Sequence, residues 1–200
     1  KQFGKYLDPR MVKKLQDNPE LCKVNGNRVD CSIIFTDLRG FTSLSESVEP
    51  EMVTYIMNNV LDVQVKAVNK YFGCTDKFIG DAIMAGFGIP VANTDDEDRG
   101  VRAGINMISR LWDWNALREK EGKAPVDMGL GLNTDKVVSG NIGSSKRMDY
   151  TMIGDGVNLA ARLESACKSY SARILISDYT YQKLKGTYQI RYIDDVVVKG

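Results

Sequence analysis

The stretch Cys31-Ser32-Ile33-Ile34-Phe35-Thr36-Asp37 decides the fold of this chain. Its apolar, mostly β-branched residues run to position 35 and are soon followed by a carboxylate, which is typical of a buried strand that ends beside an acidic side chain. The segment from Gly40 to Ser43 then turns the chain. We therefore expect a central strand with Asp37 at its C-terminal end, and the other elements are placed around it.

Hydrophobic spacing predicts strands and helices on both sides of this segment. Helices are predicted over 49–71, 94–120, 154–165 and 178–184. Strands are predicted over 75–79, 82–87, 126–132, 137–143, 150–153, 173–176 and 188–198, and the first two of these form a hairpin around Gly80-Asp81. Paired strands between helices indicate an α+β fold, an α/β sandwich with a mixed, mostly antiparallel sheet, a βαββαβ core and flanking helices.

Composition limits the possible chemistry. The chain has 200 residues, 27 Lys+Arg against 26 Asp+Glu, and no histidine. This length favours one domain, and the near-zero net charge argues against a nucleic-acid partner. The lack of histidine excludes Ser-His-Asp and Cys-His nucleophiles and most catalytic zinc sites. No apolar run approaches the roughly 20 residues of a membrane helix, and the cysteine pattern indicates reduced thiols, as in a cytoplasmic domain.

Two carboxylates stand at turns beside predicted strands. Asp37 follows the central strand and Asp81 lies in the hairpin turn, and the strand–helix–strand crossover between them can bring both to one edge of the sheet. Two adjacent carboxylates repel each other, and a pair of Mg²⁺ or Mn²⁺ ions would remove that repulsion because hard cations prefer oxygen ligands. Two metal ions suit phosphoryl chemistry. The alternative is that both aspartates only cap turns, as Asp commonly does.

Three further features have both a functional and a structural interpretation. The turn Arg39-Gly40-Phe41-Thr42 can aim backbone N–H groups at phosphate oxygens, or it can be an ordinary helix entry. Asn158 and Arg162 share one face of a helix, where they could position a ribose and neutralise a phosphate, or form an exposed polar stripe. Lys77 could donate to a purine, or could protect an edge strand.

Three segments together carry a resemblance to a known family. They are residues 35–42 (FTDLRGFT), 76–85 (DKFIGDAIMA) and 150–164 (YTMIGDGVNLAARLE). In this order and spacing they resemble the class III nucleotidyl cyclase catalytic domain, most closely that of bacterial homodimeric adenylate cyclases, including those of cyanobacteria. The resemblance covers Val29 to Gly200 and implies conversion of ATP to 3′,5′-cyclic AMP and pyrophosphate.

The resemblance also implies roles for individual positions. Asp37 and Asp81 match the aspartates that hold two Mg²⁺ or Mn²⁺ ions per active site, with the Leu38 carbonyl as a further ligand. The backbone from Arg39 through Gly40 and Phe41 to Thr42 matches the turn that holds the triphosphate. The remaining matches are Asn158, which orients the ribose; Arg162, which stabilises the transition state; and Lys199, which contacts the triphosphate.

Base selection and dimerisation follow from the same resemblance. Lys77 and Thr151 match the purine-selecting pair in its adenine form: Lys77 can donate to the ring N1 of adenine, and Thr151 can accept from the exocyclic amine. Guanylate cyclases typically carry Glu at the first of these positions. The family's active site is shared between two subunits, so the resemblance implies a homodimer with two equivalent sites. Lys77 and Asp81 would then serve opposite sites.

The domain boundaries and the rival functions complete the prediction. Residues 1–28 are expected to connect to an upstream sensor domain, and residues 29–200 to form the catalytic domain, without the further strand that family domains usually carry after the position of Gly200. The alternatives are a guanylate cyclase, or a catalytically silent cyclase-like dimer that regulates a partner. The sequence assigns no role to Lys136, for which an exposed hairpin position is the simpler interpretation.

Overall fold

The computed structural model describes residues 12–13, 16–17, 26–144 and 146–196. A single six-stranded sheet forms the centre of this part of the chain, with the strand order β2-β3-β1-β4-β5, and β6 pairs with β4 off this path. Only the β4–β6 pairing is parallel among these strands. The bounds are β1 Asn27–Arg39, β2 Cys74–Ile79, β3 Ala82–Phe87, β4 Asp127–Ser144, β5 Arg147–Ile153 and β6 Ile174–Ile176.

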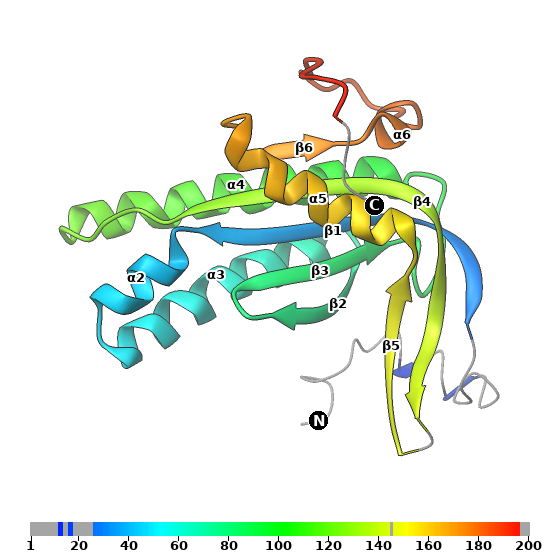
Figure 1. Ribbon diagram of the computed structural model, residues 1–200, viewed down its shortest axis with the longest axis horizontal. Coiled ribbons are helices and arrows are strands. Elements are labelled where there is room, and N and C mark those ends of the chain that lie inside the picture. Colours follow the sequence, from blue (N-terminus) through cyan, green and yellow to red (C-terminus); the bar gives the residue numbers. More distant parts are fainter. Residues whose placement is uncertain (1–11, 14–15, 18–25, 145, 197–200) are drawn as a thin grey trace.

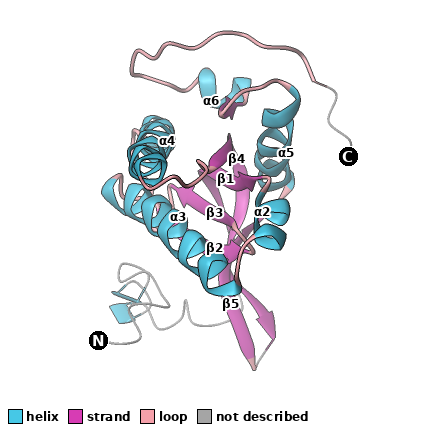
Figure 2. Ribbon diagram, turned by 90° about the vertical axis from the view of Figure 1, so that its left-hand side faces the viewer, coloured by secondary structure: helices cyan, strands magenta, loops and turns pink. Residues whose placement is uncertain are grey.

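Helices cover both faces of the sheet, as the predicted sandwich requires. Their bounds are α2 Phe41–Ser47, α3 Pro50–Lys70, α4 Asp96–Lys120, α5 Asp155–Ser169 and α6 Asp178–Tyr181. In Figure 2, α3 and α4 lie on one side of the strands, whereas α5 lies on the other. The mixed, mostly antiparallel α+β fold expected from the sequence is confirmed. Among the described residues, no helix is both long and apolar enough to span a bilayer.

Side-chain alternation along β1 separates two hydrophobic clusters. Ile34 and Leu38 belong to the cluster that α3 and α4 cover, whereas Cys31 and Ile33 belong to the cluster beneath α5. Because successive side chains of a strand point to opposite faces, the odd-numbered residues of β1 face α5. This alternation places Asp37 on the α5 side of the sheet.

One predicted break in the sheet is absent. The segments 126–132 and 137–143 were expected to be two strands, because Asn133 to Lys136 is polar, yet β4 runs through it without interruption and pairs with β1 from Asp127 to Ser139. The first two of these polar residues have buried partners instead of a turn: Thr134 hydrogen-bonds Ser32, and Asn133 donates to the carbonyl of Gly156 at 2.9 Å. Asp135 and Lys136 are exposed on the strand. Hydrogen bonds to residues distant in sequence therefore satisfy polar side chains that would otherwise need solvent.

Several predicted elements also differ from the structure at their ends. The turn after β1 continues into α2, and the helix predicted to 184 ends at Tyr181. The strand predicted over 188–198 is wrong for its described part, since residues 188–196 form neither strand nor helix. The side chain of Tyr188 bonds α4 instead of a strand neighbour. The N-terminal connector lies almost entirely outside the described residues.

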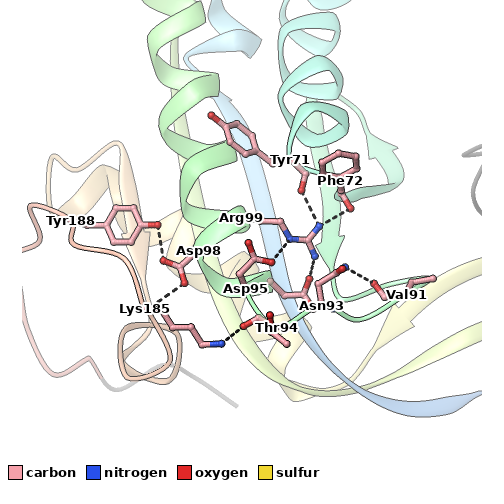
Figure 3. Close-up of polar contacts among 11 residues, drawn as sticks. Tyr71, Phe72, Val91, Asn93, Thr94, Asp95, Asp98, Arg99, Lys185 and Tyr188 are labelled. Carbon is pink, nitrogen blue, oxygen red and sulfur yellow. Dashed lines mark hydrogen bonds and ion pairs between the residues drawn. The ribbon is translucent and has the colours of Figure 1, made fainter.

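Buried charges fix this C-terminal segment and the start of α4 (Figure 3). Asp98 accepts from the Tyr188 hydroxyl at 2.7 Å and from the backbone N–H groups of Lys185 and Gly186 at 3.0 and 2.8 Å. Burial raises the pKa of the Asp98 carboxyl, but these three hydrogen bonds outweigh it and hold the pKa below its usual value. Arg99 donates to the carbonyl of Tyr71 at 3.1 Å, which joins α4 to the end of α3.

Candidate active site

Asp37 and Asp81 meet at one end of the β1–β3 pair. Thr36 is paired with Ile83 across these antiparallel strands, so Asp37 lies one residue beyond the pair and Asp81 two residues before it. The two carboxyl groups are close enough to share a hydrogen bond. Burial, the charge of Asp81 and this hydrogen bond raise the pKa of Asp37 from 3.8 to about 6, against a smaller lowering by the backbone N–H of Leu38. The two aspartates therefore form an electrostatically unfavourable pair.

A third carboxylate, Glu164 of α5, faces this pair. Burial and then the charge of Asp37 raise the pKa of Glu164, and Arg39 partly opposes them. Such an accumulation of negative charge fits a divalent cation, because oxygen ligands and uncompensated carboxylates are what Mg²⁺ and Mn²⁺ require. Within the described residues, three or more acidic or thiol side chains nowhere form a ready-made metal cage. Two carboxylates completed by substrate phosphates are the usual Mg²⁺ arrangement.

The segment after Asp37 presents backbone rather than side chains. Gly40 has φ of 67°, in the left-handed region, and is the N-cap of α2. The first N–H groups of a helix have no intrahelical acceptor, so they are available to an anion. The Arg39 guanidinium is already engaged: it lies 3.1 Å from Asp127 and also donates to the Ala172 carbonyl. The Arg39 side chain is therefore occupied within the chain, whereas the backbone N–H groups of this turn remain available to a phosphate.

Close packing against β4 sets the position of α5, which carries Asn158 and Arg162. A Cβ on Gly131 would lie 2.2 Å from the Ala160 carbonyl oxygen, so only glycine allows the helix to lie this near the strand. Asn133 holds the first turn of the helix through its bond to Gly156. Asn158 is exposed and Arg162 is half-buried. The predicted shared helix face therefore exists.

Lys77 and Thr151 come together through a residue that the sequence did not single out. The Thr151 hydroxyl donates to Asp76 Oδ2 with an Oγ1–Oδ2 distance of 2.7 Å. The backbone N–H of Met152 donates to the same oxygen at 3.1 Å. The Lys77 ammonium lies 3.6 Å from the other oxygen, Oδ1. Burial raises the pKa of Asp76, and these donors and the charge of Lys77 oppose that rise.

The site residues thus fall into three separate groups in one chain. Within the described residues, no hydrogen bond or ion pair joins Asp37 or Asp81 to Lys77 or Thr151, and none joins Asn158 or Arg162 to either pair. Lys199 lies outside the described residues. Sequence reasoning missed Asp76 and Glu164 as members of the site, although each stands inside one of the quoted motifs; a charged residue next to Lys77 in a strand was the available signal for Asp76.

Comparisons with known proteins show the family to which the chain belongs. Residues 25–200 match the model of the adenylate and guanylate cyclase catalytic domain. An adenylate cyclase from Anabaena cylindrica is 37% identical over 176 residues, which are 84% of this chain and 34% of that protein. The chain therefore spans about a third of the length of that curated relative.

Two solved structures are similar in fold and sequence. The adenylyl cyclase CyaB from P. aeruginosa has a TM-score of 0.74 and 39% identity, over 80% of this chain and 82% of that one. The guanylyl cyclase Cya2 has a TM-score of 0.78 and 36% identity, over 88% of this chain and 90% of that one. Cyclases of both nucleotide specificities therefore resemble the chain to a similar degree. By its motifs, its sheet and these matches, the chain belongs to the family of adenylate and guanylate cyclase catalytic domains, the class III nucleotidyl cyclases.

Proposed function

We propose that the chain is the catalytic domain of an adenylate cyclase that converts ATP to 3′,5′-cyclic AMP and pyrophosphate. The single observation that carries the choice of nucleotide is the Lys77–Asp76–Thr151 cluster. It presents a cationic donor and a hydroxyl oxygen side by side. Adenine offers an acceptor at N1 and a donor at its exocyclic amine, whereas guanine offers a donor and an acceptor at these positions. The cluster therefore complements adenine.

The substrate supplies the nucleophile, which explains why a chain without histidine can catalyse the reaction. The ribose 3′-oxygen forms a bond to the α-phosphorus and gives up its proton to water, while the bond from that phosphorus to the bridging oxygen breaks and pyrophosphate leaves. Asp37 and Asp81, with the Leu38 carbonyl, would hold two Mg²⁺ or Mn²⁺ ions. When bound, such ions supply Lewis-acid activation of the hydroxyl and neutralise phosphate charge.

The other residues position the reactants and stabilise charge. The backbone at Gly40, Phe41 and Thr42 binds the triphosphate, and Asn158 orients the ribose. Arg162 and Lys199 stabilise the charge that develops on the phosphates, which is the main contribution a protein makes to phosphoryl transfer. The separation of these groups within one chain supports a homodimer in which each active site takes its aspartates from one subunit. The other subunit supplies Lys77, Thr151, Asn158, Arg162 and Lys199.

The test is cyclic nucleotide production by the purified protein with ATP and with GTP, in Mn²⁺ and in Mg²⁺, over a range of protein concentrations. We expect cyclic AMP in excess of cyclic GMP and a specific activity that rises with protein concentration, because only dimers hold complete sites. Predominant cyclic GMP would instead make the chain a guanylate cyclase, the specificity of its relative Cya2. No product from protein shown to be dimeric would identify a regulatory module.

A further inference from the structure

The carboxylate of Asp76 lies where the sheet brings together residues that are distant in sequence. Asp76 belongs to β2, one edge of the strand order, and Thr151 belongs to β5, the other edge. The sheet curls enough for the two edges to meet, because β4 bends past β1 to run beside β5 (Figure 1). The Asp76 side chain is 1% exposed, so this contact is sealed from solvent.

A β-bulge directs Asp76 into this position. Thr75 pairs with Ala85 and Lys77 pairs with Met84, so Asp76 is the extra residue between two consecutive pairs. A bulge re-aims the side chains around it and is common next to active sites. Without the bulge, Asp76 and Lys77 would point to opposite faces of the sheet. The irregularity therefore lets adjacent residues contribute to one cluster.

The hydrogen bond to Asp76 also determines the direction in which the Thr151 hydroxyl can act. A free hydroxyl is both a donor and an acceptor, so it can match an amine or a carbonyl equally well. An ionised carboxylate can only accept hydrogen bonds. The Thr151 hydroxyl therefore uses its single proton to donate to Asp76, at an oxygen–oxygen distance of 2.7 Å. The Thr151 oxygen then offers only lone pairs. It can accept from the exocyclic amine of adenine and has no proton for the carbonyl oxygen of guanine.

We propose that Asp76 is a positioning residue for base selection, which acts by making Thr151 an obligate hydrogen-bond acceptor and by holding Lys77 beside it. This inference rests on the proposed function. Asp76 acts through Thr151 and Lys77 and needs no contact with the nucleotide. The bond from the Met152 N–H keeps Oδ2 in place while the hydroxyl donates to it.

The test compares the two groups that position 6 of the base can carry. ATP carries an amine there, whereas inosine triphosphate carries a carbonyl oxygen. We expect wild-type protein to prefer ATP in kcat/KM, because the Thr151 oxygen has no proton to offer the carbonyl. Asp76→Ala frees the hydroxyl to rotate and to donate to that carbonyl, so the preference should fall by roughly 3- to 10-fold, the net value of one hydrogen bond. In a Thr151→Val background there is no hydroxyl to direct, so Asp76→Ala combined with Thr151→Val should give the same ratio as Thr151→Val alone.

Asp149→Ala is the matched control, because Asp149 is an exposed aspartate on β5, and it should keep the wild-type ratio. The ratio of the kcat/KM values for the two substrates is unaffected by a general loss of folded enzyme. A merely structural role of Asp76 would therefore leave this ratio unchanged. An unchanged ratio in an active Asp76→Ala variant overturns the inference but leaves the proposed function standing. Wild-type protein that makes no cyclic AMP overturns both.

A second measurement needs no substitution at Asp76, in case that variant does not fold. The Thr151 hydroxyl proton is expected to exchange slowly with water and to give an observable NMR signal with a nuclear Overhauser effect to the Met152 amide. A hydroxyl proton that exchanges at the rate of an exposed threonine would overturn the inference, because a rotating hydroxyl can donate to a base.

Discussion

The Thr151 hydroxyl and the Asp76 carboxylate are joined at 2.7 Å although their strands occupy opposite ends of the sheet order. The contact depends on the curvature of the whole sheet, so any distortion of β4 or β5 would separate the two residues. The pair that we assign to base recognition is therefore sensitive to the global fold. The Asp37–Asp81 pair, by contrast, depends only on the adjacent strands β1 and β3.

The first prediction concerns the two aspartates. Asp37→Ala and Asp81→Ala should each lower cyclic AMP production by more than roughly 10³-fold, because the loss of either carboxylate disrupts both metal positions. The measurement is the initial rate with saturating Mn²⁺-ATP. Asp30→Ala, on the exposed start of the same strand, should retain the wild-type rate, and a nearly normal rate in Asp37→Ala would rule out the two-metal interpretation.

The second prediction tests the shared site. Arg162→Ala should lower kcat by roughly 10²–10³-fold, by analogy with the loss of one preorganised donor. When Arg162→Ala and Asp37→Ala proteins are mixed, half of the dimers should combine one of each and contain one intact site. Activity should then recover to about a quarter of wild type. Rates that simply add, with no recovery on mixing, would place all the residues of a site in one subunit.

The third prediction follows from the raised pKa of Asp37. Because the folded pKa, about 6, exceeds the usual 3.8, the folded state binds this proton more tightly than the unfolded state does. The stability that protonation provides is complete below pH 3.8 and is lost as pH rises through 6. The increase in Tm caused by Mn²⁺ should therefore be larger at pH 7.5 than at pH 5. In Asp37→Asn the Mn²⁺-induced increase in Tm should depend less on pH. An increase in wild-type Tm that is the same at both pH values would contradict this prediction.

The fourth prediction concerns Asp98. Asp98→Ala removes the acceptor of the Tyr188 hydroxyl and of two backbone N–H groups, so it should lower the free energy of unfolding by about 1–3 kcal/mol. Because the folded pKa of Asp98 lies below its usual value, its contribution is present above the unfolded pKa and is lost as pH falls through the folded one. Urea unfolding of the wild type and the variant at pH 7 and at pH 3 measures both the loss of unfolding free energy and its dependence on pH. Equal destabilisation at both pH values would show that charge does not matter here.

The fifth prediction concerns the contact between α5 and β4. Gly131→Ala would place a Cβ 2.2 Å from the backbone of α5, so the helix has to shift and Asn158 and Arg162 shift with it. We expect a loss of several kcal/mol, as for severe overpacking, and almost no activity. Gly122→Ala is the control: its Cβ meets open space but φ is 70°, so it should cost only about 1 kcal/mol of strain. A stable, active Gly131→Ala would show that the helix can move freely.

Local patterns predicted most of the elements correctly, because each depends on residues near in sequence. The periodicity of 49–71 identified α3, and the apolar run at 31–35 identified β1. The two wrong assignments of strands have one cause, which is partners distant in sequence. The Asn133–Thr134 segment stays in a strand because Ser32, Gly156 and Ser177 satisfy its polar groups. The region from Tyr188 is no strand because Asp98 holds it against α4.

The sequence by itself predicted which residues carry the chemistry: the aspartates at turns, the Asn–Arg pair one helical turn apart, and Lys77 in its motif. These residues could be predicted because local backbone geometry depends on spacing along the chain. Only the tertiary structure decided how they are grouped. The Asp37–Asp81 contact, the approach of Glu164 and the role of Asp76 as a link to Thr151 arise from strand pairing, helix packing and sheet curvature. Those long-range contacts determine the electrostatic environment that each group experiences, and no pattern of neighbouring residues encodes it.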